Sequence, residues 1–122
     1  MGATVFIVDD DRAVRAAMSL LVECCGWETR AYASAREFLD AYSPGEPGCL
    51  LLDLEMRGMS GLEAQEWLGK CEIPLPVIVV TAHDDDALAL RAREAGALAV
   101  LGKPFRDDEL VNWIERAVGP AR

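Results

Sequence analysis

The sequence predicts an α/β fold, a doubly wound parallel sheet with helices on both of its faces. Two observations support this prediction. Short apolar runs alternate with amphipathic stretches along the whole chain, and the runs are rich in leucine and β-branched residues. Such runs are typical of strands buried on both faces of a parallel sheet, and regular alternation of strands with helices covers both faces. A length of 122 residues fits one domain of this class, residues 1–122.

The apolar runs predict five strands. They are residues 3–8, 29–32, 49–52, 77–80 and 97–101. The run at 29–32 is the weakest of the five, because it holds polar residues as well. The segment 43–48, rich in proline and glycine, is a turn between a helix and a strand rather than a linker.

Between the strands, apolar residues at helical spacing predict amphipathic helices. Gly26 and Gly96 fall where two of these helices are expected to end, because glycine readily adopts the left-handed conformation of a helix terminus. The apolar stripes are Val14, Met18, Leu21, Val22 and Cys25; then Ala64, Trp67, Leu68 and Cys71; then a weak stripe of Leu88, Ala92 and Ala95; and last Leu110, Val111, Ile114, Ala117 and Val118.

Polar residues mark the expected helix starts. Ser34 and Ser60 each precede a glutamate by three residues, a capping-box pattern in which side chains satisfy free backbone N–H groups. The aspartates at 84–86 are expected in the first turn of another helix, where the helix dipole favours negative charge.

The charge balance excludes several functions. There are 21 acidic residues against 12 basic ones, a net charge of −9. Phosphate binding depends on clustered lysine and arginine, so we expect no direct nucleic-acid binding by this domain and no membrane partner. The amino terminus does not resemble a secretory signal and no apolar run is long enough to span a bilayer, which favours a cytoplasmic protein.

The four cysteines do not form a metal-binding pattern. The sequence has no Cys-x-x-Cys motif and only one histidine, His83, so a zinc site is not expected. We interpret the cysteines as small buried apolar side chains in a reducing compartment.

Polar side chains follow four of the predicted strands. Asp9 and Asp10 follow the first, Asp53 the third, Thr81 the fourth and Lys103 the fifth. Each alone has a simpler interpretation, as a helix N-cap or a surface residue. Together they indicate a site, because ligands of open α/β sheets bind at the carboxyl ends of the strands, where the strand order reverses.

The charges of these residues indicate phosphoryl chemistry. Asp9, Asp10 and Asp53 bring three negative charges together, which is costly without a cation, and Mg²⁺ prefers such oxygen ligands. The charge of Mg²⁺ and of Lys103 would balance them. Phosphoryl transfer to a carboxylate needs alignment and neutralisation rather than a general base. Asp53, expected on the middle strand between the acid pair and Thr81, is the natural nucleophile.

The chain resembles the receiver domain of two-component response regulators over essentially its whole length. The motifs that carry the resemblance are Val8-Asp9-Asp10-Asp11, Leu52-Asp53-Leu54-Glu55-Met56, Ser60-Gly61, Val80-Thr81-Ala82, Ala95-Gly96-Ala97 and Lys103-Pro104-Phe105. The loop that bears His83 is most similar to regulators of the nitrogen-fixation type. The resemblance implies a flavodoxin-like sheet of order 2-1-3-4-5 and a cis peptide bond between Lys103 and Pro104.

The same resemblance implies roles for the site residues. Asp53 would accept a phosphoryl group from a histidine kinase, and Mg²⁺ would bind Asp10, Asp53 and the backbone carbonyl of Glu55, with Asp9 behind them. Thr81 and Lys103 would bind phosphoryl oxygens. The chain would then be a phosphoryl acceptor, with self-catalysed phosphorylation and autodephosphorylation only, rather than an enzyme.

Two positions depart from the family pattern. Val100 stands three residues before Lys103, where the family places the aromatic residue that rotates during activation, so the switch of Thr81 lacks its usual partner. Arg57 stands where proline usually follows Met56, so either the loop at 57–59 is more mobile or Arg57 reaches a carboxylate of the acid cluster; we favour simple solvent exposure of its side chain.

Two further predictions concern tuning and partners. Glu55 and His83 lie two residues after Asp53 and Thr81, where family members tune the lifetime of the aspartyl phosphate, and we expect them to control the access of water. Leu90 and Trp113 each fit a half-buried core position, but together they indicate an interaction surface on the last two helices and last strand, used by a phosphorylation-dependent homodimer.

Alternatives from other classes stay open. The domain is either the amino-terminal part of a transcriptional regulator or a stand-alone receiver in a phosphorelay that acts by docking on another protein. An aspartate-nucleophile phosphatase also uses Asp and Mg²⁺, but its Asp-x-Asp-x-Thr signature is absent after Asp53. A pseudo-receiver used only for binding would have lost acceptor-site residues, which are all present here.

Overall fold

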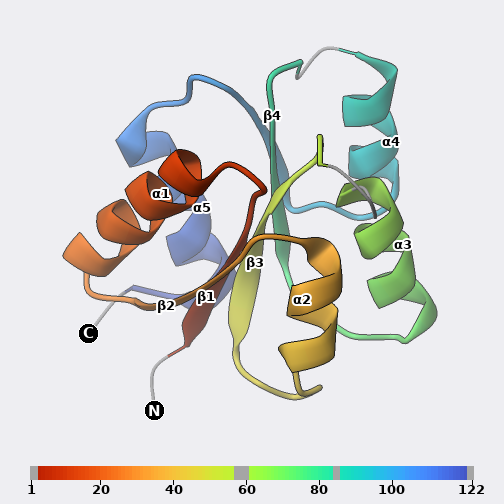
Figure 1. Ribbon diagram of the computed structural model, residues 1–122, viewed down its shortest axis with the longest axis horizontal. Helices are drawn as coiled ribbons and strands as arrows, with labels where there is room; N and C mark the ends of the chain where they lie inside the picture. Colours follow the sequence, from red (N-terminus) through yellow and green to blue (C-terminus); the bar gives the residue numbers. More distant parts are fainter. Residues whose placement is uncertain (1–2, 57–60, 84–85, 121–122) are drawn as a thin grey trace.

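The computed structural model describes residues 3–56, 61–83 and 86–120. Strands and helices alternate without exception over these ranges (Figure 1). The elements are β1 (Thr4–Val8), α1 (Arg12–Cys24), β2 (Glu28–Tyr32), α2 (Ala35–Ala41), β3 (Gly48–Asp53), α3 (Gly61–Lys70), β4 (Val77–Thr81), α4 (Ala87–Glu94), β5 (Ala99–Gly102) and α5 (Asp107–Val118).

The five strands are parallel and form one sheet of order β2-β1-β3-β4-β5. The predicted α/β class and strand order are therefore confirmed. β3 is the middle strand, and it pairs with β1 on one side and β4 on the other. The order reverses between β1 and β3, which places the crevice of a doubly wound sheet at their carboxyl ends.

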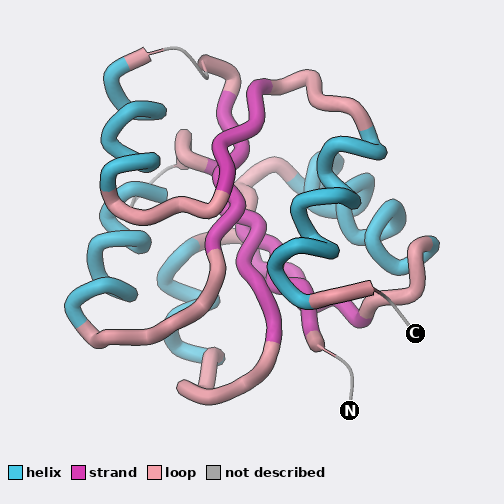
Figure 2. Tube along the Cα trace, turned by 180° about the vertical axis from the view of Figure 1, so that it is seen from behind, coloured by secondary structure: helices cyan, strands magenta, loops and turns pink. Residues whose placement is uncertain are grey.

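Alternate residues of the central strands enter two separate cores. Val5 and Ile7 of β1 face Met18 and Val22 of α1 and Leu110 of α5. Figures 1 and 2 show these two helices on one face of the sheet and α2, α3 and α4 on the other. Because both faces are covered, the central strands β1, β3 and β4 are almost entirely apolar rather than alternating, as is typical of parallel sheets.

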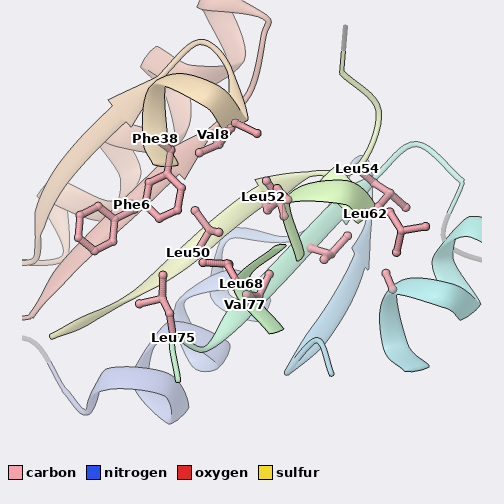
Figure 3. Close-up of a cluster of buried hydrophobic side chains, with 14 residues drawn as sticks. Phe6, Val8, Phe38, Leu50, Leu52, Leu54, Leu62, Leu68, Leu75 and Val77 are labelled. Carbon is pink, nitrogen blue, oxygen red and sulfur yellow. The ribbon is translucent and has the colours of Figure 1, made fainter. Parts of the chain in front are cut away.

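The second core lies beneath α2, α3 and α4 (Figure 3). Phe6 and Phe38 pack with a ring-centroid distance of 5.5 Å, and Leu52 and Leu68 join the same fully or almost fully buried cluster. Full burial of one such side chain stabilises the fold by about 1.5–3 kcal/mol. The two cores fix the sheet, and with it the positions of the strand ends.

The predicted helix ends are largely confirmed. Gly26 and Gly96 have φ angles of 100° and 103°, in the left-handed region that favours glycine. Ser34 is the N-cap of α2, where its Oγ accepts from Glu37 N at 3.1 Å. Asp86 is the N-cap of α4, one step before the first turn in which it was expected. The predictions for Ser60, Asp84 and Asp85 lie outside the described residues.

The fifth strand begins later than predicted. β5 starts at Ala99 rather than at residue 97, because Ala97 still takes part in the turn that follows the last residue of α4, Glu94. The N–H of Ala97 donates to the carbonyl of Ala92 at 3.2 Å, across the left-handed Gly96. Ala97 is apolar and fits the pattern of a strand, but its hydrogen bond belongs to the end of the preceding helix.

Two helix stripes are confirmed only in part. In α3 the predicted Ala64 and Leu68 are buried, but Trp67 is 41% exposed, and the helix buries Leu62 and Gln65 as well. In α4 the buried residues are Ala89 and Ala92, whereas Leu88 and Ala95 are exposed. A stripe of only three or four apolar residues does not specify which side of a helix faces the core. In α3 and α4 this orientation depends on how the two helices pack against each other.

The interpretation of the cysteines was correct only in part. Cys49 is buried in β3 and Cys25 is partly buried, whereas Cys24 and Cys71 are exposed. Cys24 is the last residue of α1, and Cys71 follows the last residue of α3, so both lie at helix ends outside the core. No helix within the described ranges is long and apolar enough to cross a membrane.

Candidate functional site

Three carboxylates meet at the carboxyl ends of β1 and β3. Asp9 and Asp10 directly follow β1, and Asp53 is the last residue of β3. One carboxylate oxygen from each lies within 4.8 Å of the other two. Asp9 is fully buried and Asp53 is 3% exposed, whereas Asp10 faces solvent. The site therefore has two buried acids at its base and one at its mouth.

Backbone hydrogen bonds hold Asp9 in place. Its Oδ1 accepts from Asp11 N at 2.8 Å, and its carbonyl oxygen accepts from Arg15 Nη1 at 2.8 Å. Asp11 in turn is the N-cap of α1 and accepts from the N–H groups of Ala13 and Val14. The start of α1 thereby fixes the loop that carries the first two acids.

Lys103 brings a positive charge to the buried acids from the end of β5. Its Nζ lies 3.3 Å from Asp9 Oδ2 and 3.6 Å from Asp53 Oδ1. Its backbone N–H donates to the carbonyl of Thr81 at 2.7 Å, which ties the end of β5 to the end of β4. The Lys103–Pro104 peptide bond is cis, as the resemblance implied.

Burial and a neighbouring negative charge raise the pKa of Asp53, the candidate phosphoryl acceptor. The pKa of Asp53 is raised from 3.8 to about 6, first by burial and then by the charge of Asp9. The N–H of Glu55, which donates to Asp53 Oδ1 at 3.2 Å, and the charge of Lys103 act in the opposite direction without cancelling the effect. The single positive charge of Lys103 therefore does not fully neutralise the two buried carboxylates, Asp9 and Asp53.

The same charges act on the lysine. Burial works to lower the pKa of Lys103, but the attraction of Asp53 and Asp9 and the hydrogen bonds to them outweigh it, and the pKa is raised. Lys103 therefore stays protonated at the pH of a cell, as a site for anionic phosphoryl oxygens requires.

Thr81, at the end of β4, is joined to the loop after β3 through Glu55. The Thr81 hydroxyl donates to Glu55 Oε1 at 2.9 Å, and the N–H of Ala82 donates to the same oxygen at 2.8 Å. His83 N–H donates to Thr81 Oγ1 at 3.1 Å, and His83 Nε2 lies 3.9 Å from Glu55 Oε2. Glu55 and His83, predicted as tuning residues, thus lie beside Thr81.

The donor set fits a hard divalent cation. Carboxylate oxygens are the ligands that Mg²⁺ prefers, and the three that meet here carry more negative charge than Lys103 alone can balance. Asp9, Asp10 and Asp53 are the side chains that would hold it, and no softer ligand such as cysteine or histidine belongs to this acid group. The resemblance assigns the backbone carbonyl of Glu55 to the metal, and the side-chain carboxylate of Glu55 contacts Thr81 and Ala82.

Val100 is separate from this group of residues. It is partly buried on β5, beside Val79 of β4, and packs against the core beneath α2, α3 and α4. It also lines a groove of about 470 Å³ together with Leu98 and Trp113. Arg57, the other departure from the family pattern, lies outside the described residues.

An apolar groove of about 610 Å³ borders the site on the side of α1. Val14, Leu20 and Leu21 of α1 form one wall, and Pro104 and Phe105 form the other. Lys103 belongs to the lining as well, so the groove reaches the lysine that pairs with Asp9 and Asp53. Leu20 is 63% exposed and presents its apolar side chain in the wall of the groove.

Sequence reasoning missed two polar contacts around the site. Arg15, four residues after Asp11, supports the carbonyl of Asp9, and only its spacing on the first helical turn could have indicated this. Gln65 is buried in α3 and donates to the carbonyl of Ala92 in α4 at 2.8 Å, a contact for which the sequence holds no signal.

Comparison with known proteins gives consistent results. Residues 5–115 match the family described as "Response regulator receiver domain". Nodulation protein W of Bradyrhizobium diazoefficiens is 40% identical over 94% of this chain and 51% of its own length. Transcriptional regulatory protein FixJ of the same organism is 34% identical over 96% of this chain and 57% of its own length.

The solved structures agree with the sequence relatives. The crystal structure of FixJ-N superposes with a TM-score of 0.86 at 37% identity, over 96% of this chain and 94% of that one. The expected similarity to regulators of the nitrogen-fixation type is confirmed. The chain spans about half the length of the curated relatives it matches.

Proposed function

The chain belongs to the response regulator receiver domain family of two-component systems, and from that premise we propose that it accepts a phosphoryl group on Asp53 in a Mg²⁺-dependent reaction. One observation carries the proposal: Asp53 lies at the end of the middle strand, among Asp9, Asp10 and Lys103, with Thr81 at the end of the next strand. Receiver domains in general are served by histidine kinases, so the donor we expect is a phosphohistidine.

The only covalent step for the protein is the formation of one bond between Asp53 and phosphorus. A carboxylate oxygen of Asp53 forms a bond to phosphorus while the N–P bond of the phosphohistidine breaks, and the electron pair of that bond stays on the imidazole nitrogen. Lys103 neutralises charge on the transferred oxygens, and Thr81 offers a hydroxyl donor to them. Bound at Asp9, Asp10 and Asp53, Mg²⁺ would supply the remaining charge neutralisation.

The state of Asp53 suits this role. A nucleophile must be deprotonated, and with a pKa of about 6 Asp53 is largely ionised at neutral pH. Burial keeps the carboxylate poorly solvated, so it has few water hydrogen bonds to give up on attack. Hydrolysis of the aspartyl phosphate by water would close the cycle, so the chain is an acceptor with self-catalysed phosphorylation and autodephosphorylation rather than an enzyme with a separate substrate.

The histidine kinase would dock in the apolar groove between α1 and the segment after β5. A phosphohistidine must approach Asp53 closely, so the docking surface has to border the acid cluster. The groove meets this condition because Lys103 belongs to its lining, and Leu20 offers an exposed apolar anchor.

The output we expect is the regulation of transcription. Relatives named as transcriptional regulatory proteins support this, and the chain matches only about half of their length. A phosphorylation-dependent homodimer would use the surface around Leu90 and Trp113 on α4, β5 and α5. Action as a stand-alone receiver that docks on another protein is the alternative. The cytoplasmic location stays a prediction.

Incubation of the chain with Mg²⁺ and acetyl phosphate, followed by intact mass measurement, tests the acceptor role. The parent should gain the mass of one phosphoryl group, and the Asp53→Asn variant and a reaction in excess EDTA should gain none. Repeated turnover of small phosphate esters would instead support a phosphatase. No adduct under any condition would leave a pure binding module.

A further inference from the structure

The carboxylate of Glu55 fills a position built for an anionic oxygen. One atom, Oε1, accepts both from the hydroxyl of Thr81 at 2.9 Å and from the backbone N–H of Ala82 at 2.8 Å. Two donors aimed at one oxygen are the arrangement by which proteins bind oxyanions, and Thr81 is only 1% exposed. We refer to these two donor groups, the Thr81 hydroxyl and the Ala82 N–H, as the oxyanion seat.

The seat lies beside the acceptor. Asp53 pairs with Val80, the residue before Thr81, and the N–H of Leu54 donates to the Val80 carbonyl at 3.0 Å. Glu55 is in turn tied to the acceptor, because its N–H donates to Asp53 Oδ1 at 3.2 Å. A phosphoryl group on Asp53 would therefore carry its oxygens to this edge of the sheet, next to the ends of β4 and β5.

The donors around Asp53 are already engaged. Lys103 is shared between Asp9 and Asp53, and both donors of the seat are engaged by Glu55. A phosphoryl group brings up to two negative charges and needs several donors. A carboxylate and a phosphoryl oxygen cannot share the same two donors, because their like charges would lie in direct contact.

We propose that the Glu55 carboxylate is a resident occupant of the oxyanion seat, which stands in for a phosphoryl oxygen in the unphosphorylated protein and is expelled when Asp53 is phosphorylated. The inference rests on the proposed function of Asp53. It assigns Glu55 as a positioning residue that competes with the phosphoryl group for its donors, whereas control of hydrolytic water alone would leave the seat empty before phosphorylation.

Expulsion of the Glu55 carboxylate would also transmit phosphorylation of Asp53 to the segment after β4 without an aromatic switch residue. Glu55 holds the hydroxyl of Thr81, and that same oxygen accepts from the N–H of His83 at 3.1 Å. Expulsion of the carboxylate would therefore move charge and hydrogen bonds at the start of the segment that leads to α4. Val100, which replaces the usual aromatic residue, takes no part in these contacts.

Binding of beryllofluoride, a non-covalent mimic of the phosphoryl group, measures the competition. The parent, Glu55→Ala and Glu55→Gln are titrated with beryllofluoride at saturating Mg²⁺, and binding is followed by the backbone amide signals in ¹H–¹⁵N spectra. Loss of a charge-assisted acceptor that is partly exposed should tighten binding to Glu55→Ala by about five- to tenfold. Glu55→Gln keeps an acceptor of the same size without the charge, so it should fall between the other two.

The amide signal of Ala82 reports the seat directly. Before any addition, it should lie downfield in the parent and move upfield in Glu55→Ala, because the carboxylate acceptor is gone. Beryllofluoride should then bring both proteins to similar Ala82 positions. Glu66→Ala, which removes one exposed charge from α3, is the matched control and should bind beryllofluoride as the parent does.

The possible outcomes distinguish failure of the occupied oxyanion seat from failure of the acceptor role of Asp53. Equal affinities in the parent and Glu55→Ala, or an Ala82 signal that Glu55→Ala leaves unmoved, would overturn the occupied seat while leaving the acceptor role intact. If no protein bound beryllofluoride and none gained a phosphoryl group from acetyl phosphate, the proposed function itself would fail. A gain in affinity shared by Glu66→Ala would reduce the effect to net charge and would also overturn the inference.

Discussion

The ammonium group of Lys103 lies 3.3 Å from Asp9 Oδ2 and thereby links the end of the last strand to the end of the first. The same nitrogen lies 3.6 Å from Asp53 Oδ1, so one lysine serves two buried carboxylates. This shared ion pair occupies the place where positive charge is needed both before and after phosphorylation. It makes Lys103 a partner of the resting acids as well as a candidate ligand of phosphoryl oxygens.

Replacement of Lys103 by alanine should have opposite effects on stability and on metal binding. In EDTA the free energy of unfolding should fall by about 2 kcal/mol, because two buried carboxylates lose their partner. Mg²⁺ should bind more tightly, because the variant lacks the cation that competes for the same oxygens. Urea unfolding and titration calorimetry measure the two effects. Lys70→Ala, at the exposed end of α3, is the control. A weaker affinity for Mg²⁺ in Lys103→Ala would contradict the shared ion pair.

Asp53 should make the stability of the protein depend on pH. Its pKa rises from 3.8 to about 6 on folding, so the folded protein binds more protons than the unfolded chain between these values. The contribution of Asp53 to stability is therefore largest below about pH 4 and is lost as the pH rises through 6. Asparagine cannot ionise, so Asp53→Asn should be more stable than the parent at pH 7 to 8, by up to about 2–3 kcal/mol.

Urea unfolding of Asp53→Asn and the parent between about pH 4 and 8, in EDTA, measures this difference. The gain should shrink to below about 1 kcal/mol at the acid end of the range, where Asp53 is protonated in the folded state and about half protonated in the unfolded chain. Asp40→Asn, an exposed aspartate of α2, should show no such pH-dependent gain. A gain that is constant over the whole range would show that the raised pKa of Asp53 is not its cause.

The fold and the acid cluster could be predicted from the sequence because both depend on order along the chain. Alternation of apolar runs specifies the parallel sheet. A residue that ends a strand or directly follows it must lie at the carboxyl end, as Asp9, Asp53, Thr81 and Lys103 do. The exposed positions of Trp67 and Leu88 could not be predicted in this way. They depend on the rotation of α3 and α4 against each other, which a short stripe does not specify.

The contacts of Glu55 lay beyond sequence reasoning for a different reason. Its position two residues after Asp53 indicated a role near the site, but the direction of its side chain depends on donors supplied by the next strand. The burial of Gln65 is similar, because its acceptor is a backbone carbonyl at Ala92 that any residue would offer. Side-chain to backbone bonds between distant segments leave no pattern in the sequence.

His83 should influence the lifetime of the aspartyl phosphate. Its side chain is exposed, its Nε2 lies 3.9 Å from Glu55 Oε2, and its backbone N–H donates to Thr81 Oγ1 at 3.1 Å. Replacement by alanine removes the ring and should shorten the lifetime of phosphorylated protein by more than a few-fold, because water gains access to phosphorus. The decay is measured by intact mass after removal of acetyl phosphate. A lifetime equal to that of the parent would exclude a role for the ring, and Asp40→Asn again provides an unaffected control.

The apolar groove beside Lys103 should affect phosphoryl transfer from a histidine kinase but not phosphorylation by acetyl phosphate. Leu20→Glu places a charge in the groove and should slow phosphoryl transfer from a cognate histidine kinase by about tenfold or more, since a central apolar anchor is lost. Phosphorylation by acetyl phosphate should be unchanged, because that donor needs no docking surface. Ala16→Glu adds the same charge to an exposed position of α1 outside the groove and serves as the control. Equal loss with both donors would locate the effect at the site rather than at docking.

The surface around Leu90 should carry the phosphorylation-dependent dimer. Leu90 is 56% exposed on α4, and Trp113 of α5 lines a groove with Leu98 and Val100 of the adjoining β5 region. Light scattering should show a higher mass in the presence of Mg²⁺ and beryllofluoride than in their absence. Leu90→Glu should abolish the increase, because it buries a charge in the contact, whereas Leu20→Glu, on α1, should preserve it. One mass under both conditions would contradict the dimer, and an increase that survives Leu90→Glu would place the contact on another face.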